Sequence, residues 1–157
     1  MKALSLRQPW AHAVLHGGKR IENRVAWTNS SFRGEFLIHA AKGMTCDEYD
    51  NAVIWAGLRG LAWANTVPDM KTLERGGIVG IARVVGVVKP DKGTPCGATI
   101  ESGPRHGYGL TPDEARWWMG AFALVLDDVR ATPFVPCKGA LGFFAVPDDV
   151  ARKALGT

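Results

Sequence analysis

Alternation of hydrophobic and polar positions predicts several short strands in this chain. In residues 35–40, Phe36 and Ile38 alternate with Glu35 and His39, which predicts a strand with one apolar and one polar face. A run of β-branched residues over 78–88 gives the strongest strand signal. The predicted strands cover residues 3–6, 20–24, 35–40, 78–88, 122–129 and 142–146.

Helix starts and stops are marked by proline, glycine and capping residues. Pro9 precedes a pattern of apolar residues at i, i+4 that ends at Gly17, and Thr45 and Thr111 each stand three residues before a glutamate. We therefore predict helices over residues 9–16, 45–58, 68–75 and 148–155, and a short one from 111. This short helix carries Trp117 and Trp118, which cannot both face inward from one helix, so we expect one of them to border a cleft.

Residues 89–110 contain repeated glycine and proline with little periodicity, and we expect a long loop there. The order of elements places runs of strands between helices, which favours an α+β fold built on a small closed or partly open β-barrel with peripheral helices. We find no internal repeat and no linker, and we expect residues 1–157 to form a single domain.

The length of 157 residues, with 46% hydrophobic and 22% charged residues, fits one globular domain. No apolar run approaches the length that crosses a membrane and the N-terminus lacks a signal-peptide core, so we expect a cytoplasmic protein. Three separated cysteines predict reduced thiols rather than a disulfide framework. The four histidines form no compact ligand motif, so no metal site is predicted.

Charge is unevenly distributed along the chain, whose formal net charge is +4. Residues 1–42 contain seven lysines and arginines against two acidic residues. Clustered basic side chains release counterions when they meet phosphates, so this basic segment favours an anionic partner such as nucleic acid.

The densest polar cluster covers residues 17–24, with the sequence GGKRIENR. If residues 20–24 are extended, Arg20, Glu22 and Arg24 share one face and Ile21 and Asn23 the other. Glu22 is then an orienting partner of the arginines, a carboxylate in a functional cleft, or half of a solvated ion pair. Lys19 has three alternatives: a cation that contacts phosphate, a base or nucleophile if burial lowers its pKa, or a surface lysine.

Further candidate ligand-binding residues surround this cluster. Four of them are cations that suit contacts with phosphate: Arg7, Arg24, Arg33 and Lys42. Four others have side chains that suit contacts with a base: Gln8, Trp10, Trp27 and His39. Gln8 is equally suited to capping the helix at Pro9, and Trp10 to packing in the core. For His39 the alternative is a structural hydrogen bond.

Several segments resemble the ASCH domain family. They are Ser5-Leu6-Arg7-Gln8-Pro9-Trp10, the pattern Gly18-Lys19-x-x-Glu22-x-Arg24, Trp27, Arg33-Gly34, Leu37-Ile38-His39-Ala40-Ala41-Lys42, Gly77-Ile78-Val79-Gly80 and Gly139-Ala140-Leu141-Gly142-Phe143-Phe144. The resemblance implies a PUA-like β-barrel, a fold whose relatives bind RNA, often at modified bases.

The resemblance also implies a hydrolase alternative. One small bacterial relative removes an acyl group from N4-acetylcytidine with a lysine and a threonine in a Gly-x-Lys-x-x-Thr segment and a distant glutamate. Lys19 matches that lysine, whereas Glu22 stands at the position of the threonine. Other members are metal-dependent ribonucleases, so a divalent metal stays an alternative although we expect no cofactor.

Our first expectation is a module that binds RNA or a nucleotide-like ligand through a basic rim around residues 17–24. The second is a hydrolase that acts on RNA or an acylated nucleoside with Lys19 and Glu22 as catalytic residues. The third is a protein-interaction module that docks an acidic partner. No membrane partner is expected, and the sequence does not indicate an oligomeric state.

Overall fold

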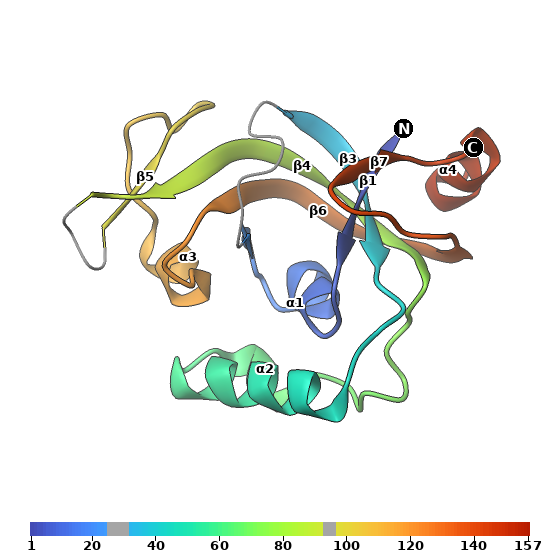
Figure 1. Cartoon of the computed structure of the whole chain (residues 1–157), viewed down its shortest axis with the longest axis horizontal. Coiled ribbons are helices and arrows are strands. Elements are labelled where there is room, and N and C mark those ends of the chain that lie inside the picture. The colour runs from blue at the N-terminus through green and yellow to red at the C-terminus, as the bar shows by residue number, and fades with distance from the viewer. Residues whose placement is uncertain (25–31, 93–96) are drawn as a thin grey trace.

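The computed structural model describes residues 1–24, 32–92 and 97–157, and the statements below concern these residues. Figure 1 shows a strongly curled sheet with helices inside and beneath its curve and the two termini near one end. The fold is the expected α+β arrangement, in the form of an open half-barrel rather than a closed one.

Strands in the described part of the chain form one seven-stranded sheet in the order β2-β6-β4-β3-β1-β7, with β5 paired to β4. Only β1 and β3 run parallel, and the other described pairs are antiparallel. The strands are β1 (Lys2–Leu6), β2 (Ile21–Asn23), β3 (Gly34–Ala40), β4 (Gly77–Pro90), β5 (Ala98–Ile100), β6 (Ala123–Pro136) and β7 (Phe143–Ala145).

Irregular pairing between the two longest strands bends the sheet. The register of β4 against β6 shifts between Ile78 and Gly80, between Ile81 and Arg83, and between Val84 and Gly86. Each such bulge adds local twist, so repeated bulges along two 14-residue strands curl them into the half-barrel.

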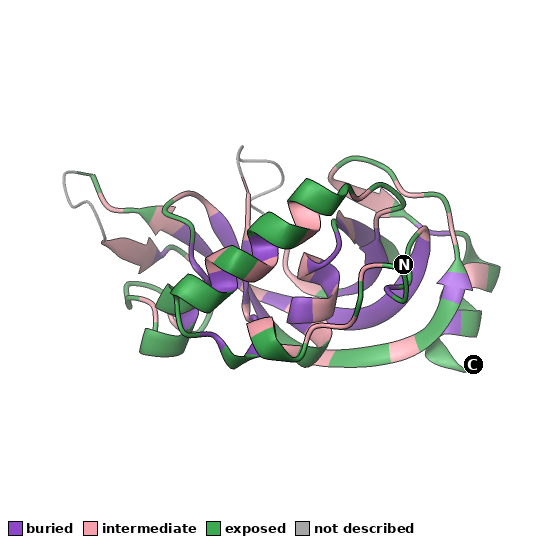
Figure 2. Cartoon of the chain, turned by 90° about the horizontal axis from the view of Figure 1, so that it is seen from below, coloured by how far each residue is buried: buried purple, intermediate pink, exposed green. Residues whose placement is uncertain are grey.

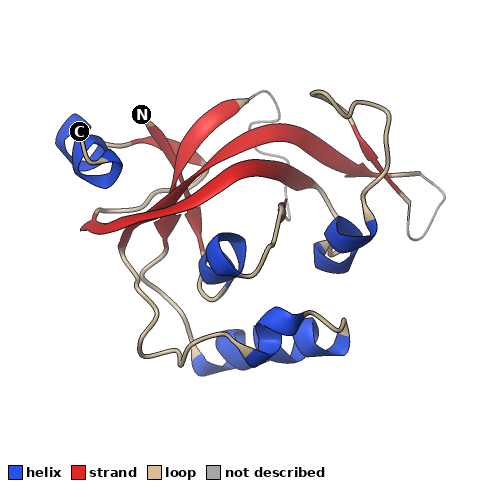
Figure 3. Cartoon of the chain, turned by 180° about the vertical axis from the view of Figure 1, so that it is seen from behind, coloured by secondary structure: helices blue, strands red, loops and turns tan. Residues whose placement is uncertain are grey.

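Helix α1 (Trp10–His16) lies inside the curve of the sheet, and α2 (Cys46–Leu58) lies beyond it (Figure 3). Val14 of α1 and Phe36 of β3 are both fully buried in the cluster that fills the half-barrel. The helix approaches β4 at Gly80, where a Cβ atom would lie 2.4 Å from Cδ2 of Leu15. A larger residue at position 80 would therefore displace the side chain of Leu15 and press on the backbone of β6, where the carbonyl oxygen of Arg130 would lie 2.8 Å away.

Both predicted capping boxes are confirmed. Thr45 caps α2 and Thr111 caps α3 (Pro112–Trp117), and each accepts a backbone hydrogen bond from the glutamate three residues later. The 3₁₀ helix η1 (Ala62–Asn65) follows α2, and α4 (Asp148–Leu155) closes the chain as predicted. No helix of the described residues is both long and apolar enough to span a bilayer.

The predicted helix over residues 68–75 is wrong. Turns occupy residues 70–72, and the Asp69 carboxylate accepts a hydrogen bond from the backbone N–H of Lys71. An aspartate that bonds the backbone two residues on stabilises a turn in competition with a helix.

Two further expectations about strands are corrected. The 89–110 loop contains β5, in which Ile100 pairs with Val88 of β4. Strand β6 continues to Pro136, seven residues past the predicted end. Residues 130–136 are mostly exposed and include Pro133 and Pro136, and proline weakens the strand signal. Figure 2 shows this long stretch of strand as largely exposed at one edge of the molecule.

The predicted polar face of β3 is buried as well, except at Glu35, whose side chain is 38% exposed. Leu37 lies in a second cluster with Ile78 and Ala151 of α4, so helix α4 and β7 cover the face that α1 does not. Trp117 and Trp118 are also both buried, at 3% and 8% exposure. Trp118 lies beyond the last helical residue in an extended conformation, which turns its side chain inward independently of Trp117.

Candidate functional site

Lys19 is buried at the junction between α1 and β2. Its side chain is 2% exposed, and its Nζ atom donates a 2.7 Å hydrogen bond to Oε2 of Glu22, which is 9% exposed. The alternatives of a surface lysine for Lys19 and of a solvated ion pair for Glu22 are therefore wrong. The pair is buried beside Trp10.

The backbone explains why Lys19 points inward. The chain leaves α1 through Gly18, whose φ of +73° is in the left-handed region, and the N–H of Lys19 then bonds the carbonyl of Ala13. Two residues later Ile21, fully buried, pairs with Val125 of β6. Lys19 is thus fixed between a helix end and a sheet edge.

Arg24 completes a charged triad. Its Nη2 atom lies 3.6 Å from Oε1 of Glu22, which is an ion pair but too long for a hydrogen bond. This buried nitrogen has no hydrogen-bond partner among the described residues. Two cations and one carboxylate leave the triad with a net charge of about +1 when Lys19 is protonated.

Burial lowers the pKa of Lys19 below its usual range, because a desolvated ammonium group is disfavoured. The carboxylate of Glu22 opposes this shift through its charge and its hydrogen bond, and the charge of Arg24 adds to it. The net direction is downward, as expected for a lysine at a site that exchanges protons.

Trp10 lies beside the triad, with its ring centroid 5.8 Å from Nζ of Lys19. Three more indoles extend from it. Trp63 stacks on Trp10 at 6.1 Å, Trp55 meets it edge-on at 5.6 Å, and Trp117 contacts both Trp55 and Trp63. The partly exposed Trp10 is therefore both a core residue and a surface one.

On its open side Trp10 lines a cleft of about 320 Å³, which we call the Trp10 cleft. The other residues that line it come from three segments: Arg7, Gln8, Glu48, Asn51, Ala52, Trp55 and Met119. Met119 is held there by Asn23 of β2, whose side chain accepts a hydrogen bond from its backbone N–H. Strand β2 thus contains Glu22 of the triad and, through Asn23, holds a residue that lines the cleft.

Other polar side chains of the predicted binding segment make hydrogen bonds that serve the fold. Gln8 caps α1 by accepting from the N–H of His12 and donates to the carbonyl of Glu74, so both ends of its amide serve the fold. Arg33 bonds the carbonyl of Phe32 and Oγ of Ser102, away from the triad. Arg20 bonds the carbonyls of Val14 and Lys19 rather than Glu22.

Arg7 lies at the Trp10 cleft, where it forms an ion pair with Glu48. Hydrogen bonds to the carboxylate of Glu48 from the backbone of Thr45 and from Arg7 hold its pKa below the usual range. Trp27 lies outside the described residues.

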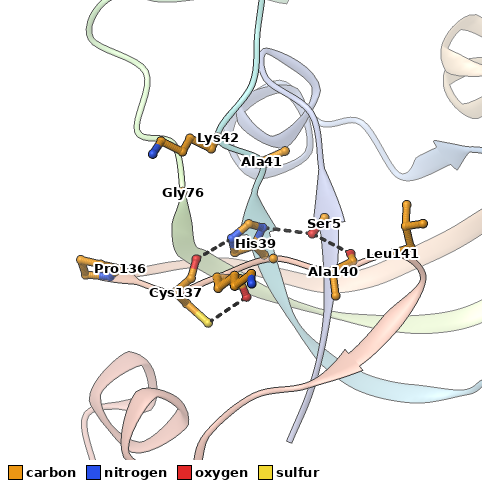
Figure 4. A pocket seen from close by; sticks show the side chains of 11 residues that line it. Ser5, His39, Ala41, Lys42, Gly76, Pro136, Cys137, Ala140 and Leu141 are labelled. Atoms are coloured by element: carbon orange, nitrogen blue, oxygen red, sulfur yellow. Dashed lines mark hydrogen bonds between the residues drawn. The ribbon is translucent and has the colours of Figure 1, made fainter.

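His39 and Lys42 line a different and larger cavity, of about 820 Å³, which we call the His39 cavity (Figure 4). His39 is 2% exposed, and its ring lies between Oγ of Ser5 at 3.1 Å and the carbonyl oxygen of Cys137 at 2.9 Å. The sequence prediction therefore joined residues of two separate sites.

Sequence reasoning missed Trp55 and Met119 at the cleft, and Ser5 and Lys138 at the cavity. Trp55 lies inside the predicted 45–58 helix, and Lys138 directly precedes the Gly139-Ala140-Leu141 motif, so both had a local signal. The sequence around Met119 gave no such signal, because only tertiary packing brings Met119 next to Trp10.

The His39 cavity and the triad differ in what makes each a candidate site: cavity volume for the first, and buried charge for the second. The His39 cavity is the larger, but the triad combines a buried ion pair with an unsatisfied guanidinium nitrogen. Buried ion pairs are expensive to desolvate and are weak evidence for stability. We therefore take the triad and the Trp10 cleft as the primary candidate site.

The described residues contain no group of three or more histidine, cysteine, aspartate or glutamate side chains that could hold a metal ion. Cys46 and Cys137 are free thiols. Burial raises the pKa of Cys137, and the charge of Asp149 adds to this. Neither cysteine contributes to the triad.

Comparisons with known proteins agree with the fold and the motif. The model of the ASCH domain matches residues 4–130. The crystal structure of ASCH from Zymomonas mobilis superimposes with a TM-score of 0.51 at 14% identity, covering 99% of this chain and 93% of that one. A serine-to-alanine mutant of the Z. mobilis protein gives a TM-score of 0.48, also at 14% identity, covering 99% and 94%.

No curated protein matches the sequence. The family match spans most of the chain and includes the triad, α1 and the strands that build the half-barrel. The chain belongs to the ASCH domain family.

Proposed function

We propose that the protein binds RNA or a nucleotide-like ligand at the triad of Lys19, Glu22 and Arg24 and in the adjoining Trp10 cleft. ASCH domains form a PUA-like family often linked to RNA binding. The observation that carries the proposal is the buried Nη2 atom of Arg24, a charged donor without a hydrogen-bond partner among the described residues.

A phosphate or base oxygen would satisfy this donor. Guanidinium groups bond such oxygens strongly, and an unpaired buried donor costs about 1–3 kcal/mol. The net positive charge of the triad favours an anionic or electron-rich group, and Glu22 keeps both cations in place. Trp10, partly exposed beside them, lines the cleft together with Trp55 and gives it an aromatic wall against which a base can pack.

The test is a titration of fluorescein-labelled single-stranded RNA at low salt, read by anisotropy. Arg24→Ala is expected to weaken binding by about tenfold or more. Arg83→Ala is the matched control, because Arg83 also pairs with carboxylates, those of Glu35 and Asp128, but lies outside the site. Equal affinity of the two variants, or no binding by the wild type, would refute the proposal.

A second candidate function, hydrolysis of RNA or an acylated nucleoside, is favoured by the lowered pKa of Lys19 and its 2.7 Å contact with Glu22. A lysine that loses its proton readily can act as a general base toward water or as a nucleophile. Chromatography after incubation with N4-acetylcytidine or RNA, with and without divalent metal, tests it. Product that forms with the wild type and is lost in Lys19→Met supports hydrolysis; product that persists in this variant rules out a catalytic Lys19.

The third expectation, an acidic protein partner, has no specific support among the described residues. A pull-down with nuclease treatment separates it from RNA binding, since a partner bridged by RNA is released by the nuclease.

A further inference from the structure

We propose that the His39 cavity is a second binding site, which takes a phosphate monoester on a small apolar or aromatic body. The two sources of this chemistry are a free nucleotide and the 5′-phosphate end of an RNA strand. The cavity is separate in residues from the triad and the Trp10 cleft, and its occupation does not rest on the function proposed for them.

Charge is the first argument. Lys42 and Lys138 line the cavity, both are exposed, and neither forms an ion pair within the described part of the chain. None of the residues that line it is acidic. Asp149 of α4 acts through its charge on Cys137 of the lining, and Asp149 itself pairs with Lys153. Two uncompensated ammonium groups match a phosphate monoester, which carries about −1.5 to −2 at neutral pH, better than a carboxylate or a phosphodiester.

The floor of the cavity is a chain of three polar contacts (Figure 4). Nε2 of His39 meets the carbonyl of Cys137 at 2.9 Å, Nδ1 meets Oγ of Ser5 at 3.1 Å, and Oγ meets the carbonyl of Ala140 at 3.2 Å. Both ends of the chain are carbonyl oxygens, which only accept hydrogen bonds.

The three polar contacts of Ser5 and His39 need more protons than the two side chains supply. A neutral imidazole and a hydroxyl supply two protons for three contacts, so the Ser5 hydroxyl must leave either Nδ1 of His39 or the carbonyl of Ala140 without a donor. The Ser5 hydroxyl is therefore a donor with more than one acceptor within reach, and it can turn its proton toward a ligand in the cavity.

Close packing keeps the floor in place. A Cβ atom at Gly139 would lie 2.5 Å from Cε1 of His39 and 2.8 Å from Oγ of Ser5. Glycine at this position lets the backbone of residues 137–141 rest on the His39 ring. Because Ser5 and His39 are also register partners on the parallel strands β1 and β3, the sheet itself fixes their separation.

Size and wall chemistry define the rest of the ligand. A volume of about 820 Å³ falls within the range of small-molecule sites. Ala41, Pro136 and Leu141 give the walls an apolar character, and Leu141 is 99% exposed. An apolar or aromatic body attached to the phosphate would cover this leucine. Inorganic phosphate alone would not, so we expect it to bind more weakly than a nucleotide.

The test is isothermal titration calorimetry at low salt in the Arg24→Ala background, which removes the site proposed above. The probes are adenosine 5′-monophosphate, its 3′,5′-cyclic diester, and one RNA oligonucleotide with either a 5′-phosphate or a 5′-hydroxyl end. We expect each monoester to bind at least about tenfold more tightly than its counterpart. The 5′-phosphate oligonucleotide binding more tightly than the mononucleotide would assign the site to RNA ends, and the reverse to free nucleotides.

Replacing both cavity lysines, Lys42→Met with Lys138→Met, is expected to weaken monoester binding by at least about tenfold. Lys71→Met with Lys92→Met removes the same charge from exposed positions that do not line the cavity, and binding should stay within about twofold. Equal binding of monoester and diester, or equal loss in both double variants, would overturn the proposal. Unchanged RNA binding in Arg24→Ala would instead refute the first site and leave this one standing.

Discussion

Two ion pairs in this protein have similar partners but different surroundings. Arg105 holds Glu114 through two guanidinium nitrogens, one of them at 2.8 Å, and also bonds the carbonyl of Gly109. Lys19 holds Glu22 through one contact, and Arg24 approaches the same carboxylate without a hydrogen bond. The Arg105–Glu114 pair is partly exposed, at 36% and 11%, whereas Lys19 and Glu22 are 2% and 9% exposed.

The difference separates a pair whose hydrogen bonds are completed within the fold from one that leaves a neighbouring charged donor unsatisfied. Glu114 also accepts the N–H of Thr111 in its capping box, so its pair fastens the 97–110 segment to α3. The Lys19–Glu22 pair is desolvated and leaves the Nη2 atom of Arg24 without a hydrogen-bond partner among the described residues. Where a fold buries charge and does not satisfy it, a ligand is the natural complement.

The largest expected effect is that of Glu22→Ala, which leaves Lys19 and Arg24 buried together without a carboxylate. We expect the free energy of unfolding to fall by about 3–5 kcal/mol, measured by urea denaturation. Glu35→Ala is the control, because Glu35 pairs with two arginines at an exposed position and should cost about 1 kcal/mol or less. Similar losses in the two variants would contradict the account.

The double variant Lys19→Met with Glu22→Leu sharpens the comparison. Apolar residues of similar volume often replace a buried ion pair at no cost, so we expect it to regain at least about 2 kcal/mol relative to Glu22→Ala. RNA binding should nevertheless stay lost in the anisotropy assay. A double variant that is stable and still binds RNA as the wild type does would show that the pair has no part in recognition.

Arg105→Ala tests the other ion pair of the comparison, that of Arg105 with Glu114. It removes a pair that is partly exposed, and we expect a loss of about 1–2 kcal/mol in the free energy of unfolding. RNA affinity should stay within about twofold of wild type, since neither residue lines the Trp10 cleft. A large loss of RNA affinity in this variant would mean that the 97–110 segment contributes to binding.

The smallest expected effect is on how the stability of the fold depends on pH, through the carboxyl group of Glu114. Burial alone would raise the pKa of Glu114, but hydrogen bonds from Arg105 and Thr111 outweigh it and lower the pKa. Because the folded-state pKa is lowered, the ionised carboxylate stabilises the fold at pH values above the unfolded pKa, and this stabilisation is lost as pH falls through the folded pKa. The free energy of unfolding of Glu114→Gln, from urea denaturation, should therefore be lower than that of wild type by about 1 kcal/mol or less at neutral pH, and the difference should shrink as the pH falls through the acid range. A difference that stays constant over this range would refute this.

Much of the fold could be predicted from local signals. Capping threonines marked α2 and α3, and the β-branched run marked β4, because each of these depends on neighbours along the chain. The error over residues 68–75 was local, because the turn at Asp69 competes with a helix, whereas the error at β3 came from tertiary packing. Strand β3 is buried on both faces because α4 packs on the second one, and no periodicity within residues 35–40 contains that information.

The site was predicted in part. Proximity in sequence brought Lys19, Glu22 and Arg24 together, and the structure keeps them together. Their burial was beyond the sequence, since the charged segment lies between a helix end and a sheet edge that only the fold creates. His39 and Lys42 were grouped with them because all belong to one basic segment, yet β3 carries these two residues to the other cavity.

The most direct measurement is the structure of the protein in complex with a short single-stranded RNA. The account predicts a phosphate or base oxygen within hydrogen-bonding distance of Nη2 of Arg24, and a base against the ring of Trp10. RNA bound elsewhere, with Nη2 of Arg24 still lacking a partner, would contradict the central claim.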